Sequence, residues 1–170
     1  FKSVTDASSN YSKMISELIN DKKRNALIVD DIASEVDVCE GVCLVLSERK
    51  AHCEILHKYL EYNYNIKAEL LTGSLTSKQR KTVLQKLDLK MVKVLIATGQ
   101  LIGEGFDCKE LSTLFLVTPI KFEGRLLQYL GRILRTAPNK TKAKVYDYVD
   151  KEVAVLKNAA QTREQVYAIN

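Results

Sequence analysis

Apolar residues recur along the chain in two alternating patterns. The first 40 residues carry apolar side chains at helical spacing, with Met14, Ile15 and Leu18 in the first stretch. Asp21 is a residue of the type that begins helices and opens a second stretch. We therefore expect helices over residues 11–20 and from Asp21 onward. The second helix is expected to bury one side, formed by Leu27, Ile28, Ile32 and Val36.

After Gly41 the pattern changes to short apolar runs that alternate with helical stretches. Such runs are typical of strands covered on both faces, and they predict strands at residues 42–46, 68–71, 92–97, 113–117 and 143–149. Helical spacing predicts helices at residues 49–62, 124–134 and 152–167, and Thr76-x-x-Gln79 is a capping box that opens another. This order of elements predicts an α/β fold with a mainly parallel sheet and helices on both faces.

The composition is that of one compact globular domain. The chain has 170 residues, of which 46% are hydrophobic and 28% charged, so it can form one core and is neither disordered nor fibrous in type. No apolar run approaches the roughly 20 residues of a membrane helix, and no signal peptide begins the chain. We therefore expect a cytoplasmic protein without membrane contact. Because the chain begins at Phe1 rather than Met, we interpret it as part of a longer protein.

The charge and the cysteine content say little about which ligands the protein binds. The net charge is +5, and residues 121–151 hold eight basic side chains against three acidic ones, so this segment is the best candidate for phosphate contacts. None of the four cysteines has C-x-x-C spacing, and we interpret them as reduced thiols. Cys53 and His57 have the spacing of a metal pair, but buried cysteines are common, and we expect no metal site.

Polar residues follow several of the predicted strands directly. In parallel sheets, ligands bind beyond the carboxyl ends of the strands. Ser47, Thr72-Gly73 and Thr98-Gly99 stand at such ends. The sequence therefore places the functional residues along this edge of the sheet.

The strongest single signal is the element Q-x-x-G-R-x-x-R. In a helix, Arg132 and Arg135 lie at about +40° and −20° from Gln128, so the three form one polar stripe. Gly131 allows close approach of another backbone or ligand. The opposite, buried side is expected to hold Leu126, Leu127, Leu130, Ile133 and Leu134. Taken alone, a basic pair of this kind is more often a solvated helix face.

This helix resembles motif VI of superfamily 2 helicases. In that family, two arginines reach across an interdomain cleft toward the γ-phosphate of an ATP molecule that the other domain mainly binds. The resemblance implies a RecA-like three-layer fold, with Arg132 and Arg135 as arginine fingers and Gly131 beside the nucleotide. Gln128 would sense the phosphate or the attacking water. A guanidinium suits this role because it offers a fixed fork of donors to a transferring phosphate.

Residues 94–107 resemble motif V. The resemblance implies that Thr98 and Gly99 contact a nucleic-acid phosphate, while Gly105 and Asp107 face the nucleotide. DEAD-box proteins usually carry arginine and glycine where Glu104-Gly105 stands here. The sequence E-G-F-D at residues 104–107 is more similar to motif V of DNA-directed relatives, including restriction and repair translocases. This resemblance favours DNA over RNA as the substrate.

Two weaker elements complete the order of helicase motifs. Residues 43–47, ending at Ser47, resemble motif IV, and Thr72-Gly73 resembles the following strand-end element that touches backbone phosphate. The resemblance covers residues 42–149. It implies that residues 41–170 form a helicase C-terminal RecA-like domain and that residues 1–40 lead in from an ATP-binding domain.

The sequence lacks the other half of an ATPase site. It contains no G-x-x-x-x-G-K-[ST], and Asp30-Asp31 follows no predicted strand and resembles no magnesium-binding motif. We expect ATP and Mg²⁺ to be bound mainly by an N-terminal RecA-like domain that precedes these residues in the full protein.

Three alternatives to a DNA helicase or translocase remain at this point. An RNA helicase and a catalytically inactive nucleic-acid-binding module share the fold. A dinucleotide-binding domain is the third, although Gly103-x-Gly105 is followed by Cys108 instead of a third glycine. His52 falls on an apolar helix side, so we expect a packed, hydrogen-bonded imidazole rather than a catalytic one, and we expect His57 at the surface.

Overall fold

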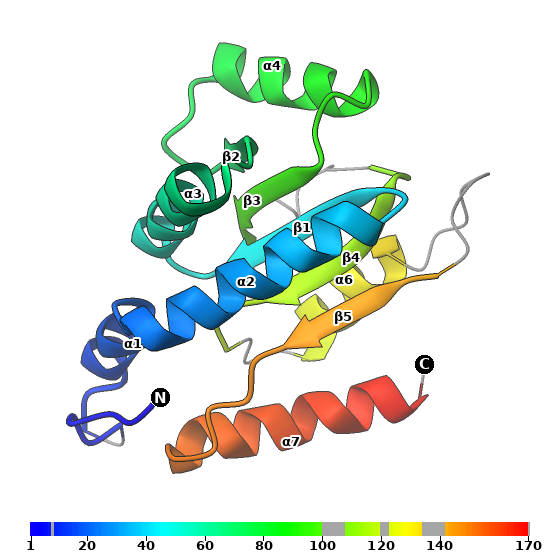
Figure 1. Ribbon diagram of the computed structural model, residues 1–170. Helices are drawn as coiled ribbons and strands as arrows, with labels where there is room; N and C mark the ends of the chain where they lie inside the picture. The colour runs from blue at the N-terminus through cyan, green and yellow to red at the C-terminus, as the bar shows by residue number, and fades with distance from the viewer. Residues whose placement is uncertain (8, 100–107, 120–122, 134–141, 170) are drawn as a thin grey trace.

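The protein forms a five-stranded sheet in which every pair of neighbouring strands is parallel (Figure 1). The computed structural model describes residues 1–7, 9–99, 108–119, 123–133 and 142–169. The strands stand in the order β2-β3-β1-β4-β5. Their bounds are Val42–Ser47 (β1), Ala68–Leu71 (β2), Val94–Thr98 (β3), Leu111–Leu116 (β4) and Lys144–Asp147 (β5). The predicted parallel α/β sheet is confirmed, with strand ends shifted by up to two residues.

Six helices in the described residues connect or flank the strands. Their bounds are Tyr11–Ile19 (α1), Lys22–Val38 (α2), Lys50–Tyr64 (α3), Ser77–Asp88 (α4), Glu123–Ile133 (α6) and Ala154–Ile169 (α7). Side chains satisfy the free N–H groups at several helix starts: Asp21 caps α2, and Thr76 and Gln79 form the predicted capping box of α4. Each helix expected from apolar spacing is present.

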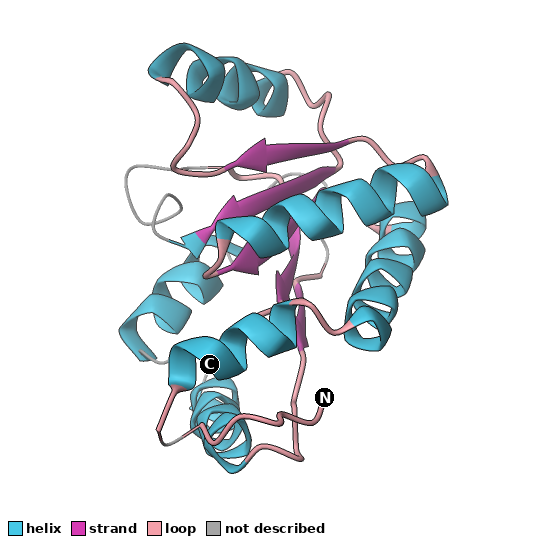
Figure 2. Ribbon diagram, turned by 90° about the vertical axis from the view of Figure 1, so that its left-hand side faces the viewer, coloured by secondary structure: helices cyan, strands magenta, loops and turns pink. Residues whose placement is uncertain are grey.

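Helices cover both faces of the sheet (Figures 1 and 2). Alternate residues of β1 point to opposite faces, so Cys43 and Val45 pack against α2 and α3, while Leu44 and Leu46 belong to the core beneath α4, α6 and α7. All six residues of β1 are buried, as expected for a strand with helices on both sides. The predicted three-layer arrangement is confirmed.

A buried arginine fixes α2 to the ends of two strands. Arg24 Nε lies 3.0 Å from Asp150 Oδ1, and its Nη1 donates to the Val117 carbonyl at 2.8 Å. Ile28 and Ile32 of the same helix are fully buried in the core, but Leu27 is 54% exposed, so its predicted burial was wrong. The inner side of α2 is centred on Ile28 and Ile32, and Leu27 is rotated away from it.

A smaller apolar cluster joins the two ends of the described chain. Its buried members come from α1, from the residue just before α7 and from the first turn of α7: Met14, Ile15, Leu18, Ile19, Val153 and Leu156. Residues 1–40 therefore hold α1 and α2, and α2 packs directly on the sheet. The predicted connection from these helices to a preceding domain stays a prediction. Among the described residues, no helix has both the length and the apolar character needed to cross a bilayer.

Candidate functional site

The strand ends named from the sequence meet at one edge of the sheet. Ser47 at the end of β1 pairs with Thr98 at the end of β3, and Leu71, which precedes Thr72, pairs with Ala97. Because β2, β3 and β1 are neighbours and parallel, their carboxyl ends open on the same side. The predicted gathering of these residues at the carboxyl edge is confirmed.

Ser47 is at this edge but faces inward. Its side chain is buried, and Oγ accepts from the Arg49 backbone N–H at 3.2 Å and lies 3.2 Å from His52 Nδ1. The hydroxyl is therefore engaged within the domain. Direct contact of this hydroxyl with a nucleic acid stays a prediction, and its burial favours a supporting role.

His52 continues this buried network. Asn25 donates through its amide nitrogen to the Ile19 carbonyl, so its oxygen, 3.0 Å from His52 Nε2, accepts from that ring nitrogen. In the neutral ring, this tautomer makes Nδ1 an acceptor, and Nδ1 faces the Ser47 hydroxyl. Burial, with a smaller contribution from the Arg24 charge, lowers the pKa of His52 from 6.5 to about 3. The expected packed, hydrogen-bonded imidazole is confirmed.

Thr72 and Gly73 form a turn that leads into α4. The Thr72 hydroxyl lies 3.0 Å from that of Ser74, and the Thr72 carbonyl accepts from the Leu75 N–H. Gly73 is exposed, and a Cβ there would meet no atom within 4 Å. An exposed turn of this kind leaves its backbone accessible to a phosphate group.

Thr98 and Gly99 differ from that turn because a helix packs tightly over them. Thr98 is half-buried and Gly99 is buried. The Tyr129 hydroxyl, from α6, donates to the Gly99 carbonyl at 2.9 Å. A Cβ on Gly99 would lie 2.5 Å from this hydroxyl and 2.6 Å from Glu48 Oε1, so only glycine fits.

The described side chains of α6 divide between a buried and an exposed side. Tyr129 and Leu130 are buried, whereas Gln128 and Gly131 are exposed, and a Cβ on Gly131 would meet open space. Leu127 is 45% exposed, so its predicted burial was wrong. The buried side is centred between Tyr129 and Leu130, and Leu127 lies about 100° before Gln128 around the helix.

The remaining predicted site residues are Arg132, Arg135, Gly105 and Asp107, whose side chains lie outside the described part of the structure. The backbone of Arg132 lies on α6, one residue after Gly131. Arg135, Gly105 and Asp107 lie outside the described residues. Their predicted roles stay predictions. Within the described part of the chain, no group of three or more His, Cys, Asp or Glu side chains is arranged to hold a metal ion.

Residues 26–137 match a protein-family model described as the helicase conserved C-terminal domain. This chain belongs to that family. The match spans α2 to α6 and includes every candidate site residue named above. The assignment to superfamily 2 is therefore confirmed.

Two relatives of this helicase C-terminal domain have names that describe them as putative helicases. Helicase 22 of Sulfolobus islandicus filamentous virus (isolate Iceland/Hveragerdi) is 27% identical over 141 residues, which cover 82% of this chain and 25% of the viral protein. ATP-dependent helicase IRC3 of Saccharomyces cerevisiae is 26% identical over 136 residues, which cover 79% of this chain and 19% of the yeast protein. This domain therefore spans a quarter or less of the length of these relatives.

A solved structure has the same fold. The crystal structure of T4 UvsW matches with a TM-score of 0.73 at 20% sequence identity, covering 94% of this chain and 35% of that chain. At this identity the likeness concerns the fold alone, and the RecA-like helicase C-terminal architecture is confirmed.

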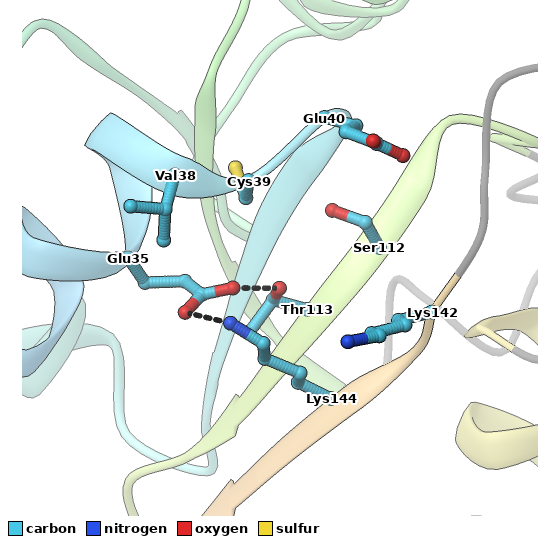
Figure 3. A pocket seen from close by; sticks show the side chains of 8 residues that line it. All are labelled: Glu35, Val38, Cys39, Glu40, Ser112, Thr113, Lys142 and Lys144. Carbon is cyan, nitrogen blue, oxygen red and sulfur yellow. Dashed lines mark hydrogen bonds and ion pairs between the residues drawn. The ribbon is translucent and has the colours of Figure 1, made fainter.

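The structure also shows a polar pocket at the opposite, amino edge of the sheet, which sequence reasoning missed (Figure 3). Its cavity measures about 260 Å³. Glu35 of α2 is buried there and accepts from Thr113, Lys144 and Tyr146 at 2.8 to 3.0 Å. Burial alone would raise the pKa of Glu35, but these hydrogen bonds outweigh it and lower the pKa below its usual value. Since its partners are already within the domain, Glu35 joins α2 to β4 and β5.

Tyr129 was likewise not singled out from the sequence. It occupies a variable position of Q-x-x-G-R-x-x-R, so the motif drew no attention to it. A signal was nevertheless present, because residue 129 lies three positions after Leu126 and four before Ile133, both of which were expected on the buried side. A tyrosine hydroxyl on a buried side needs a hydrogen-bond partner.

Proposed function

We propose that this chain is the C-terminal RecA-like domain of an ATP-dependent DNA helicase or translocase. In this proposal Arg132 and Arg135 act as arginine fingers, and Gln128 senses the phosphate, at an ATPase site shared with a preceding RecA-like domain. The observation that carries the proposal is the placement of α6. Tyr129 and Leu130 anchor this helix at the carboxyl edge of the sheet, and Gln128 and Gly131 are left facing outward.

The residues present suit one half of a nucleotide site. Open space beside Gly131 and the exposed Gln128 leave room for a phosphate group to approach α6. ATP, bound with Mg²⁺ mainly by the preceding domain, supplies the free energy of phosphoanhydride hydrolysis. The guanidinium groups of Arg132 and Arg135 stabilise negative charge on the transferring phosphate, and Gly105 and Asp107 are assigned to the nucleotide by their motif.

The nucleic-acid surface is proposed for the strand ends of β2 and β3. The exposed backbone of Gly73 and the half-buried Thr98 offer amide and hydroxyl groups, which read phosphates rather than bases. Gly99 and Thr72 shape these two turns, and Ser47 supports them from below. The sequence E-G-F-D in motif V supports DNA as the substrate, and RNA is the second candidate.

The decisive experiment removes the arginines from the full-length protein. Arg135→Ala should lower nucleic-acid-stimulated ATPase by roughly 10³-fold with little change in ATP affinity, because the guanidinium acts on charge that develops only during transfer. Arg132→Ala should behave similarly, and lysine should restore neither, since an ammonium lacks the planar fork. Gln128→Ala should be milder. Steady-state ATPase with saturating single-stranded DNA, and then with RNA, measures these effects and identifies the preferred strand.

The matched control is Lys157→Ala, which removes an exposed cation from α7. It should retain wild-type turnover. Thr98→Ala should weaken strand binding at moderate salt without changing turnover at saturating DNA. Near-normal ATPase in a folded Arg132→Ala, Arg135→Ala double variant would rule out the proposed site.

A further inference from the structure

Tyr129 connects the two surfaces assigned above. Its side chain is 1% exposed and belongs to the core cluster that also holds Leu46, Ala97 and Leu116. The ring is thus fixed by packing, and its hydroxyl donates to the Gly99 carbonyl at 2.9 Å. A hydrogen bond in such a buried place has a defined geometry, because neither partner can rotate into water.

The contact leaves no spare room at the end of β3. A Cβ on Gly99 would lie 2.5 Å from Tyr129 Oη, closer than real Cβ atoms approach other heavy atoms. The next ring atom, Cζ, would be 3.5 Å away, which is ordinary van der Waals contact. The hydroxyl oxygen alone therefore sets how closely α6 and the strand end approach on the tyrosine side.

The two partners lie directly beside the proposed functional residues. Gly99 follows Thr98 in the chain, and Tyr129 follows the exposed Gln128 and lies one turn before Arg132. A shift of the Thr98-Gly99 backbone must therefore move the helix turn that carries Gln128, or break this hydrogen bond.

We infer that Tyr129 is a positioning residue through which nucleic-acid binding at Thr98-Gly99 sets the placement of Gln128 and Arg132 for ATP hydrolysis. This inference rests on the proposed function. Tyr129 is buried, and its contribution is the hydroxyl that donates to the Gly99 carbonyl.

The test is Tyr129→Phe in the full-length protein, which keeps the ring and removes only the hydroxyl. The maximal nucleic-acid stimulation of ATPase should fall about threefold to tenfold, the rate change that corresponds to one net hydrogen bond. The nucleic-acid concentration for half-maximal stimulation should change far less, because Thr98 and Gly73 remain. The matched control is Tyr167→Phe, which removes a hydroxyl that donates to Asp147 at 2.9 Å, away from β3. It should leave the stimulation unchanged.

A second pair of variants tests the same contact by steric fit. Gly99→Ala should reduce stimulation strongly. Adding Tyr129→Phe should restore part of it, because the oxygen on the buried ring is then gone, and the other close atom, Glu48 Oε1, ends an exposed, flexible side chain that can move aside. Unchanged stimulation in Tyr129→Phe, or no rescue in the double variant, would overturn the inference while leaving the arginine result intact. Absence of nucleic-acid-stimulated ATPase in the wild type would instead overturn the proposed function and this inference together.

Discussion

At the scale of single residues, the carboxyl edge is organised by buried polar groups with defined partners. Asn25, His52 and Ser47 form a chain of contacts that runs from α2 through α3 to the end of β1. A buried polar group without partners would be destabilising, so these groups hold one another in a single arrangement. The strand end that carries Ser47 is thereby fixed in place.

His52 gives this network a pH dependence. Its pKa is about 3 in the folded protein and near 6.5 when unfolded, so between these values the unfolded chain binds a proton that the folded chain does not. The stabilisation from the neutral imidazole is present above about pH 6.5 and is lost as the pH falls toward 3. From about pH 7.5 to about pH 5.5, this group should lower the free energy of unfolding by about 1 kcal/mol.

Urea denaturation of the 170-residue domain at the two pH values measures this loss. His52→Gln should show a smaller loss than the wild type. If His52→Gln does not fold, the imidazole nitrogen shifts of the wild type report the same quantity. A His52 ring that becomes protonated near pH 6 in the folded protein would contradict the assignment.

At the scale of elements, the periodic pattern of α6 predicted the helix but only part of its buried side. The spacing of polar and apolar positions correctly predicted a helix with Gln128 outward and Leu130 inward. It misplaced Leu127, because hydrophobicity alone does not fix the centre of the buried side. The tyrosine, whose ring is apolar and whose hydroxyl finds a partner, occupies that centre instead.

These two leucines differ in their contribution to stability. Leu130 is 6% exposed, so Leu130→Ala should cost about 3 kcal/mol by leaving a cavity in the core beneath α6. Leu127→Ala removes the same atoms from a largely exposed position and should cost less than about 1 kcal/mol. Chemical denaturation of both variants gives the comparison. Equal losses would mean that α6 is rotated from the position described here.

The positions of the strands along the chain were also predictable from the pattern of apolar residues, but their order in the sheet was not. Short segments rich in apolar residues identified all five strands of the sheet, and the alternation with helices predicted that they are parallel. The order β2-β3-β1-β4-β5 cannot be predicted from local sequence patterns, because neighbouring strands such as β1 and β4 are far apart in the sequence. The same holds for Glu35, whose partners Thr113 and Lys144 lie 78 and 109 residues away.

At the scale of the whole molecule, the sheet has two chemically different edges. The amino edge holds Glu35 and Lys144 in an ion pair that is closed within the domain. The carboxyl edge leaves Gly73 and Gln128 exposed, with hydroxyl and backbone groups nearby. A sheet edge with exposed polar groups is suited to ligands from outside, and the family assignment agrees with this polarity.

The domain should therefore fold alone but lack ATPase activity alone. Its sequence has no phosphate-binding loop with the lysine that reaches the phosphates, and α6 supplies only groups that act on charge developing during transfer. The purified 170-residue domain should give a cooperative melting transition, no measurable ATP turnover, and no heat of binding with micromolar Mg·ATP in calorimetric titration. The arginine-to-alanine double variant of the domain should give the same titration as the wild type. Micromolar affinity for Mg·ATP, or turnover by the pure domain, would place a complete nucleotide site within these residues and contradict the shared-site proposal.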